Sequence, residues 1–119
     1  MVKALFDTNV LIDYLNGVKN ARAELARFDD KAISVISWIE VMLGATENTL
    51  AGTRAFLAGF EHMPVTALVA ERALALRQDK RIKLPDAIVW ATARTSDRLL
   101  VTRNTKDFAA DEPGVRVPY

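Results

Sequence analysis

Apolar residues follow two different periods along the chain, and the alternation between the two predicts the fold class. Short runs of branched and apolar residues predict strands at residues 2–6, 31–36 and 99–102, with shorter strands at 63–65 and 114–117. Apolar residues at helical spacing predict helices at residues 8–15, 19–28, 38–44, 50–60, 67–81 and from residue 84 onward. Strands that alternate with helices indicate an α/β domain with a mainly parallel sheet of four to five strands.

Polar residues and a proline mark the predicted helix starts. Ser37 followed by Glu40 has the spacing of a capping box, in which the serine caps the helix and the glutamate bonds back to it. Thr66 is the predicted cap of the helix at residues 67–81. Pro85 suits the first turn of the following helix, where its missing N–H costs nothing. That helix is apolar on almost every side, so we expect it to be buried.

Four carboxylates occur where predicted strands end or predicted helices begin. Asp7 ends the first strand, Glu40 and Asp86 lie in first turns of helices, and Asp107 follows the strand at residues 99–102. In a parallel sheet these positions meet at one edge, where α/β folds bind their ligands. Each residue also has a structural explanation: Asp7 as an N-cap, Glu40 as a capping partner, Asp86 as a helix-dipole partner and Asp107 as a turn residue.

Carboxylates gathered at one edge would repel one another, and a divalent cation would remove that cost. The chain has no cysteine and a single histidine, His62, which excludes disulfides, thiolate zinc sites and multi-histidine metal sites. A surface or strand-edge position explains His62 itself. Oxygen ligands alone favour Mg²⁺ or Mn²⁺, which activate water and polarise phosphoryl oxygens. This residue set therefore supports phosphodiester hydrolysis.

Other phosphate chemistries lack their motifs in this chain. Neither the G-x-x-x-x-G-K-[ST] loop nor the G-x-G-x-x-G loop occurs. Phosphatases with an aspartyl nucleophile have D-x-D-x-[TV] after the first strand, whereas the run here is Asp7-Thr8-Asn9-Val10 and lacks the second carboxylate. The acidic residues that precede a receiver-domain phosphoacceptor are also missing, so the fit to that class is poor.

The net charge of +1 hides an uneven distribution. Residues 72–107 contain nine Lys or Arg against four Asp or Glu, whereas residues 1–71 contain six against nine. The basic segment is explained either by attraction of a polyanion or by an ordinary solvated helix surface.

A chain of 119 residues, half of them apolar, is typical of one folded domain. No signal-peptide pattern and no bilayer-length apolar stretch are visible, so we expect a cytoplasmic protein without a membrane role.

Four stretches of the chain together resemble the PIN-domain ribonucleases, and within them the VapC-type toxins of toxin–antitoxin pairs. They are LFDTNVLIDYL at residues 5–15, SVISWIEVMLGA at 34–45, LPDAIVWATA at 84–93 and LLVTRNTKDF at 99–108. The stretches come in the family's order and extend over nearly the whole chain. The resemblance implies that residues 1–119 form a single PIN domain, a three-layer α/β fold with helices on both faces of the sheet.

The resemblance also implies roles for the site residues. Asp7 and Asp86 match the principal ligands of Mg²⁺ or Mn²⁺, and Glu40 matches a residue that binds a second ion or orients water. The family has Asp or Asn at the position of Asn104, and Asp107 three residues later. Because this chain has Asn104, Asp107 is the candidate for the fourth catalytic carboxylate. Supporting roles in the pocket fall to Thr8, Asn9, Thr102 and Asn104.

The same resemblance implies an endoribonuclease that cuts single-stranded or looped RNA, with tRNA a candidate, forms a homodimer and is inhibited by a small antitoxin protein. Apolar residues that either contact such partners or belong to the core are Leu11, Tyr14, Trp38 and Trp90. Basic residues expected to hold the RNA backbone are Arg77, Arg81, Lys83, Arg103 and Lys106. Two alternatives stay open: a catalytically weak RNA- or protein-binding PIN module, which Asn104 motivates, and a nuclease that acts on DNA.

Overall fold

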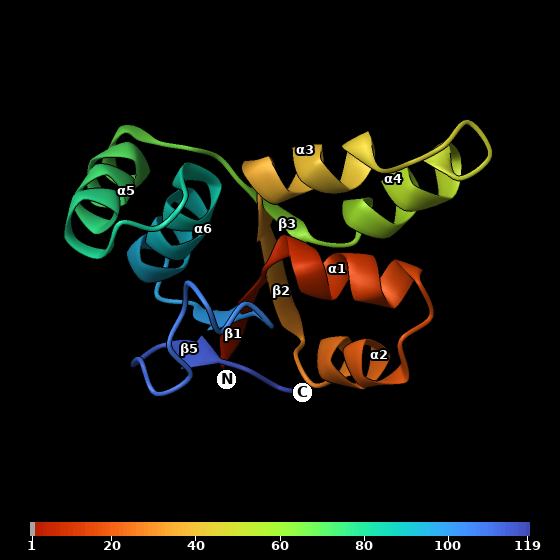
Figure 1. The fold of residues 1–119 in the computed structure, drawn as a ribbon. Coiled ribbons are helices and arrows are strands. Elements are labelled where there is room, and N and C mark those ends of the chain that lie inside the picture. The colour runs from red at the N-terminus through yellow and green to blue at the C-terminus, as the bar shows by residue number, and fades with distance from the viewer. Residues whose placement is uncertain (1) are drawn as a thin grey trace.

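Five parallel strands form one sheet with helices on both of its faces in the computed structural model, which describes residues 2–119 (Figure 1). The strand order across the sheet is β3-β2-β1-β4-β5, and every neighbouring pair is parallel. The strands are β1 (Lys3–Phe6), β2 (Asp30–Ser34), β3 (Glu61–Met63), β4 (Leu99–Val101) and β5 (Val115–Arg116). The predicted α/β fold with a parallel sheet is thereby confirmed.

The helices form two layers that cover opposite faces of the sheet. Their bounds are α1 (Thr8–Leu15), α2 (Lys19–Ala26), α3 (Val35–Leu43), α4 (Leu50–Ala58), α5 (Ala67–Lys80) and α6 (Leu84–Thr95). Figure 1 shows α5 and α6 on one side of the sheet and the other four helices on the opposite side. The predicted three-layer arrangement is therefore the observed one.

Alternate residues of β1 enter two separate hydrophobic cores, as the two-residue period of a strand requires. Ala4 and Phe6 pack with α1 to α4, and Leu5 packs with α5 and α6. The Phe6 ring meets the rings of Phe28 and Phe60 edge-on, at centroid distances of 5.8 and 6.0 Å. Both faces of β1 are buried, which explains why its sequence is a continuous apolar run.

The capping box predicted at Ser37 is wrong, because β2 ends earlier than its branched residues suggest. Ser34 is extended, with φ −72° and ψ 148°, and its hydroxyl accepts from the Ile36 backbone N–H at 3.2 Å. Val35 and Ile36, which have strand propensity, therefore form the first turn of α3. Ser37 lies inside this helix and is buried, and Glu40 lies one turn further along.

Other boundaries shift by smaller amounts. Strand β3 covers residues 61–63 and ends before Pro64, whereas 63–65 was predicted, because Pro64 has no N–H for a sheet hydrogen bond. Helices α2 and α4 each end two residues before their predicted ends. Thr66 caps α5 as predicted, accepting from the Val69 N–H at 3.2 Å. Within residues 2–119, no helix combines the length and the apolarity that a membrane span needs.

Candidate metal-dependent active site

Asp7 connects β1 to α1 and acts both as a helix cap and as a buried acid. Its Oδ1 accepts from the Thr8 N–H at 2.8 Å, and its Oδ2 accepts from the Thr102 hydroxyl at 2.8 Å and from the Asn9 amide at 3.2 Å. Only 4% of the residue is exposed. Burial raises the pKa of the Asp7 carboxyl, the hydrogen bonds from Thr102 and Thr8 oppose this rise, and the charge of Glu40 adds to it. The two explanations offered for Asp7, cap and candidate ligand, are therefore compatible.

Glu40 projects from α3 toward the start of α1. Its Oε1 lies 2.8 Å from the Thr8 hydroxyl oxygen, and the Ser37 hydroxyl oxygen lies 3.0 Å from the same atom. Thr8 has a single hydroxyl proton, and a carboxylate is the stronger acceptor, so Thr8 donates to Glu40. The Ser37 hydroxyl oxygen is a second acceptor within reach of the Thr8 hydroxyl. Ser37, the predicted cap, lies beside Thr8 because the helix starts three residues earlier than predicted.

Asp86 lies in the first turn of α6, as predicted, and is half-buried. Burial raises the pKa of its carboxyl to about 7, hydrogen bonding with Asp107 adds to this shift, and so do the charges of Asp7, Asp107 and Glu40. Charges shift the pKa of a carboxyl group only over short distances, so Asp7, Asp107 and Glu40 must all lie near Asp86. The structure therefore brings the predicted carboxylates Asp7, Glu40, Asp86 and Asp107, hereafter the acidic cluster, together at the carboxyl edge of the sheet.

The loop after β4 carries the remaining predicted residues. The Asn104 amide donates to Asp107 Oδ2 at 2.9 Å, and the Asp107 N–H donates back to Asn104 Oδ1 at 3.3 Å. The hydrogen bond from Asn104 holds the pKa of Asp107 below its ordinary value. The backbone N–H of Asn104 in turn donates to the Thr102 hydroxyl oxygen at 3.0 Å. Asn104 therefore orients Asp107.

The acidic cluster has the properties of a site for a hard cation. No ion pair forms at any of its four members within residues 2–119. In the same part of the chain, no three Asp, Glu or His side chains lie close enough to hold a metal ion by themselves. Mg²⁺ commonly takes only one or two carboxylates and keeps several waters, so the oxygen-only donor set fits Mg²⁺ or Mn²⁺. Asp7 and Asp86, whose carboxyl pKa values are both raised by burial, are the residues that would hold it.

The predicted RNA-binding cations divide into two groups. Arg81, Lys83 and Lys106 are exposed, and the charges of Lys83 and Lys106 lower the pKa of Asp107, which places both beside the acidic cluster. Arg77 donates to the carbonyl of Ile82 at 2.7 Å, and Arg103 pairs with Asp13. The last two guanidinium groups are engaged within the chain, although both residues keep exposed surface.

Two of the four apolar residues considered for partner contacts belong to the core. Leu11 is fully buried and Trp90 is 2% exposed, with its ring edge-on to Phe108 at 5.2 Å. Tyr14 and Trp38 keep part of their surface exposed. Both have intramolecular partners, because Tyr14 stacks on Phe56 at 4.5 Å and Arg54 lies over Trp38 at 5.4 Å.

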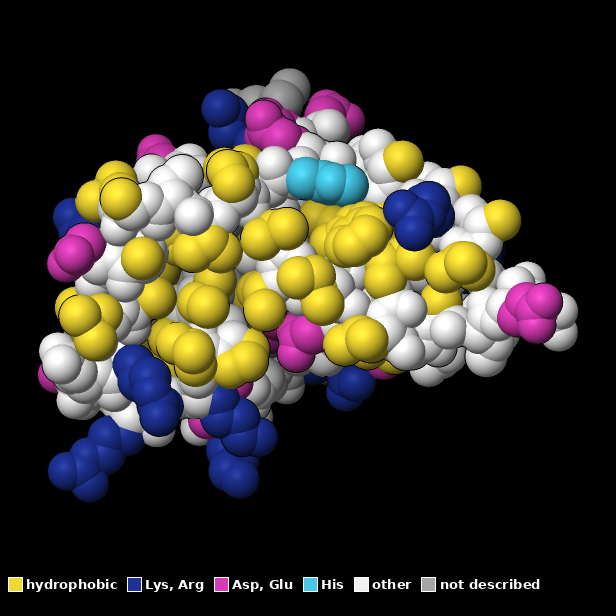
Figure 2. Space-filling view, turned by 90° about the horizontal axis from the view of Figure 1, so that it is seen from above, with side chains coloured by type: hydrophobic (Ala, Val, Ile, Leu, Met, Phe, Trp, Pro, Cys, Tyr) yellow, Lys and Arg dark blue, Asp and Glu magenta, His cyan; other side chains and the backbone are white. Residues whose placement is uncertain are grey.

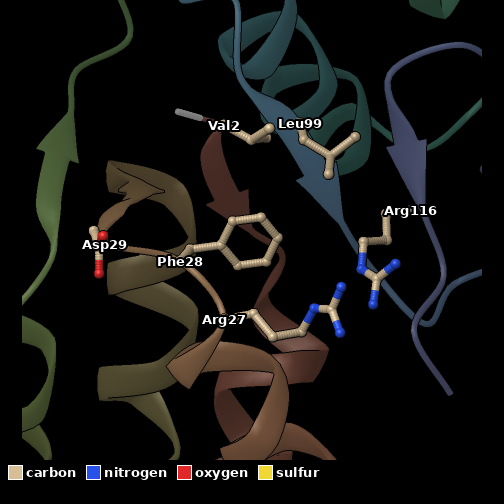
Figure 3. A pocket seen from close by; sticks show the side chains of 6 residues that line it. All are labelled: Val2, Arg27, Phe28, Asp29, Leu99 and Arg116. Carbon is tan, nitrogen blue, oxygen red and sulfur yellow. The ribbon is translucent and has the colours of Figure 1, made fainter.

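A cavity of about 350 Å³ lies at the opposite, amino edge of the sheet (Figure 3). The guanidinium groups of Arg27 and Arg116 point toward each other there (Figure 3), and both pair with the buried Glu24. None of the acidic cluster lines this cavity. Its lining residues are Val2, Arg27, Phe28, Asp29, Leu99 and Arg116.

Sequence patterns did not reveal two sets of buried ion pairs, one beside the loop after β4 and the other at the amino edge of the sheet. Asp13 is 9% exposed and binds Arg103 and Tyr119, and Arg98 is 8% exposed and binds Asp30 and Glu61. Asp13 is a charged residue inside the apolar run VLIDYL, and this is the signal that could have identified the Asp13 ion pair.

Comparisons with known proteins confirm the resemblance that the four sequence stretches carry. The PIN domain family model matches residues 4–111. Ribonuclease VapC10 of Mycobacterium tuberculosis is 38% identical over 112 residues, covering 87% of this chain and 84% of that protein. A toxin–antitoxin complex from Klebsiella pneumoniae contains a chain of 47% identity and TM-score 0.93, covering 98% of both chains. VapBC-5 of M. tuberculosis, a VapBC-family toxin–antitoxin system, aligns at 26% identity and TM-score 0.68, covering 98% and 100%.

Proposed function

The chain belongs to the PIN-domain family, and from this premise we propose that it is a Mg²⁺- or Mn²⁺-dependent endoribonuclease, the toxin of a toxin–antitoxin pair. The observation that carries the proposal is the acidic cluster, in which burial and neighbouring carboxylate charges raise the pKa of Asp7 and of Asp86, and in which no member forms an ion pair within the described part of the chain. A bound divalent ion would supply Lewis acidity to a phosphodiester and a water of lowered pKa. We also propose that residues 1–119 act as a single PIN domain in the cytoplasm.

The side chains of the site have distinct tasks in this proposal. Asp7 and Asp86 would hold the metal ion, and Thr102 favours the carboxylate form of Asp7 by donating to it at 2.8 Å. Glu40, oriented by Thr8, faces the attacking water or holds a second ion. Asp107, oriented by Asn104, completes the negative surface.

The exposed cations beside the cluster suit a polyanionic substrate. Lys83 and Lys106, whose charges act on Asp107, would neutralise phosphates near the scissile bond, and the exposed Arg81 would bind the backbone further away, in each case independently of base sequence. Figure 2 shows Lys and Arg side chains gathered along one border of the molecule, next to apolar surface. The relative from M. tuberculosis is named a ribonuclease, which supports RNA rather than DNA as the substrate.

An antitoxin protein is the proposed partner of this toxin. The 47% identical chain was solved in a toxin–antitoxin complex, and this supports the same type of partner here. A largely apolar groove of about 290 Å³ between α1, α3 and α4 offers a surface for it. The groove includes Ile12 and Leu15, which are 41% and 40% exposed.

A second copy of the chain is the other proposed partner. Figure 2, seen from the side of α3, α4 and α5, shows apolar side chains across much of this face. Exposed apolar residues of these helices are Ile39, Leu43, Leu50, Leu68 and Leu74. Leu43 is 80% exposed, which is unfavourable for an isolated domain and favours a homodimer.

A cleavage assay tests the function. Purified protein is incubated with total tRNA or single-stranded DNA, in Mg²⁺, Mn²⁺ or EDTA, beside the Asp86→Asn variant. The proposal expects discrete RNA fragments that require both the metal and Asp86. RNA that is retained but not cut would favour the weak binding module, and cleavage of DNA alone would favour a deoxyribonuclease.

A further inference from the structure

Arg103 lies near the start of the loop that follows β4 and is held to α1 at two points. Its backbone N–H donates to Asn9 Oδ1 at 3.1 Å, and its guanidinium donates from Nη2 to Asp13 Oδ1 at 3.1 Å and pairs through Nε with Oδ2. Asn9 and Asp13 are four residues apart on α1 and so share one face of the helix. This face therefore receives both the backbone and the side chain of Arg103.

The two neighbours of Arg103 both contact the acidic cluster. Thr102 donates to Asp7, and Asn104 donates to Asp107. Consecutive Cα atoms are only about 3.8 Å apart, so fixing Arg103 also restricts where Thr102 and Asn104 can lie. A displacement of Arg103 from α1 would shift the donors that orient Asp7 and Asp107.

The acidic side of this contact is buried, and the C-terminal residue completes it. Asp13 is 9% exposed, its Oδ2 accepts from the Tyr119 hydroxyl at 2.9 Å, and the Arg103 guanidinium lies 5.7 Å from the centre of the Tyr119 ring. Figure 1 shows the C-terminal segment running from β5 toward α2. A buried carboxylate with three donor contacts fixes its partner more firmly than an exposed ion pair would.

We propose that Asp13 and Arg103, completed by Tyr119, form a clamp that positions the loop of residues 102–107 against α1 and thereby sets the geometry of the acidic cluster. Arg103 is then a positioning residue and contributes little to holding RNA, because Asp13 neutralises its charge. This inference rests on the proposed function for its catalytic consequence, but its structural consequence can be measured without any nuclease activity.

A second buried pair provides a matched control. Glu24 is 3% exposed and accepts two hydrogen bonds from Arg116. Arg116 Nε donates to Glu24 Oε2, and Arg116 Nη2 donates to Glu24 Oε1 at 2.9 Å. Like the clamp, this pair connects the α1–α2 hairpin to a residue of the C-terminal part of the chain. Arg116 lies on β5, and the one described hydrogen bond between it and the loop at 102–107 runs from the Thr102 backbone N–H to the Arg116 carbonyl oxygen at 3.0 Å, a backbone contact that Arg116→Met retains.

The first test compares Arg103→Met and Asp13→Asn with Arg116→Met in the full chain. Hydrogen exchange at the amides of residues 103–108 and Mn²⁺ binding by calorimetry are measured, with the urea midpoint as the measure of stability. We expect loop amides to exchange at least about tenfold faster in the clamp variants. We expect Mn²⁺ affinity to fall roughly tenfold. Arg116→Met should lower the urea midpoint but leave both readouts unchanged.

Unchanged loop exchange and unchanged Mn²⁺ affinity in both clamp variants would overturn the proposal, and so would equal effects in Arg116→Met. If Arg103→Met fails to fold, Tyr119→Phe removes only one hydrogen bond and should speed loop exchange by a smaller factor. Failure of the proposed function would appear differently. The wild type would then leave RNA uncut, while the clamp variants would still show faster loop exchange and weaker Mn²⁺ binding.

A kinetic test separates positioning from RNA contact where cleavage is observed. The clamp predicts that Arg103→Met lowers kcat and leaves both KM and its salt dependence close to wild type. A direct phosphate contact predicts a raised KM and a salt slope smaller by about one charge. Lys83→Met serves as the reference for a lost phosphate contact. A raised KM and a smaller salt slope in Arg103→Met, as in Lys83→Met, would overturn the proposal.

Discussion

The Thr102 hydroxyl donates to Asp7 Oδ2 at 2.8 Å, and the Asp7 N–H donates to the carbonyl of Val101 at 2.9 Å. The ends of β1 and β4 are thus joined by one side-chain and one backbone hydrogen bond. Thr102 is fully buried and Asp7 is 4% exposed, so water cannot replace a lost donor easily. The Thr102 hydroxyl therefore opposes the rise that burial imposes on the pKa of Asp7.

Replacement of Thr102 by valine should destabilise the protein most at pH values where Asp7 is ionised. The hydroxyl stabilises the carboxylate form, so its loss raises the pKa of Asp7 further and weakens metal binding. We expect a loss of about 1–2 kcal/mol at pH 8 and less at pH 4, measured by urea unfolding in EDTA. Thr92→Val, which removes a buried hydroxyl that donates to the Ile88 carbonyl, should show no such pH dependence.

Asp86→Asn should stabilise the metal-free protein at neutral and higher pH. Because the pKa of Asp86 is about 7 in the folded protein and 3.8 in the unfolded chain, the folded state holds the proton more tightly. Stability then falls as pH rises from about 4 to 7, and the variant should lack this fall. After allowance for the partial exposure of Asp86, we expect a gain on the order of 1 kcal/mol at pH 8.

The same variant should lose the stabilisation that a metal ion provides. Wild type at 100 times the dissociation constant for Mn²⁺ should gain about 2.7 kcal/mol, and Asp86→Asn should gain much less. Urea unfolding with and without Mn²⁺ measures both effects. A variant less stable than wild type in EDTA at pH 8 would contradict the electrostatic argument.

Arg98→Met should destabilise the amino edge of the sheet. Arg98 donates to the Ala4 carbonyl at 3.3 Å, to Asp30 at 2.8 Å and to Glu61, and so connects β1, β2 and β3. Since the arginine is buried while both carboxylates are partly exposed, we expect a loss of about 2–3 kcal/mol. Arg98→Lys should recover part of it, and a change below about 0.5 kcal/mol in Arg98→Met would refute this role.

Arg81→Gly should separate stability from RNA binding. Arg81 ends α5 with φ 55° and ψ 32°, which is a left-handed conformation. This conformation is unfavourable for a residue with a Cβ atom, whereas glycine adopts it freely. We expect the variant to gain about 0.5–1 kcal/mol of unfolding free energy, yet to bind RNA with a weaker salt dependence. Asp97→Gly, at φ 54°, should gain similar stability without the effect on RNA.

Leu43→Glu should convert the proposed homodimer into a monomer. The side chain is 80% exposed, so the folding stability should change by less than about 0.5 kcal/mol, while a buried unpaired charge would oppose dimer formation. Sedimentation equilibrium measures the change in mass. Val2→Glu, at a residue that is 60% exposed at the amino edge, should leave the dimer intact, and a wild-type monomer would remove the proposal.

The sequence alone determined the strands, most helices and the identity of the acidic cluster. Continuous apolar runs mark strands buried on both faces, and acids at their ends must meet at one edge of a parallel sheet. Such signals are local or follow from simple topology, so Asp7, Glu40, Asp86 and Asp107 could be proposed from the sequence alone.

Only the tertiary structure decided how these carboxylates are supported. Val35 and Ile36 have strand propensity, but packing and the cap at Ser34 place them in α3, and this turns Ser37 from a cap into a partner of Thr8. Asp13 and Arg103 are 90 residues apart, and no periodic pattern connects them. Ion pairs of this kind depend on which surfaces meet after the sheet has formed, because their stability comes from joint burial and not from local propensity.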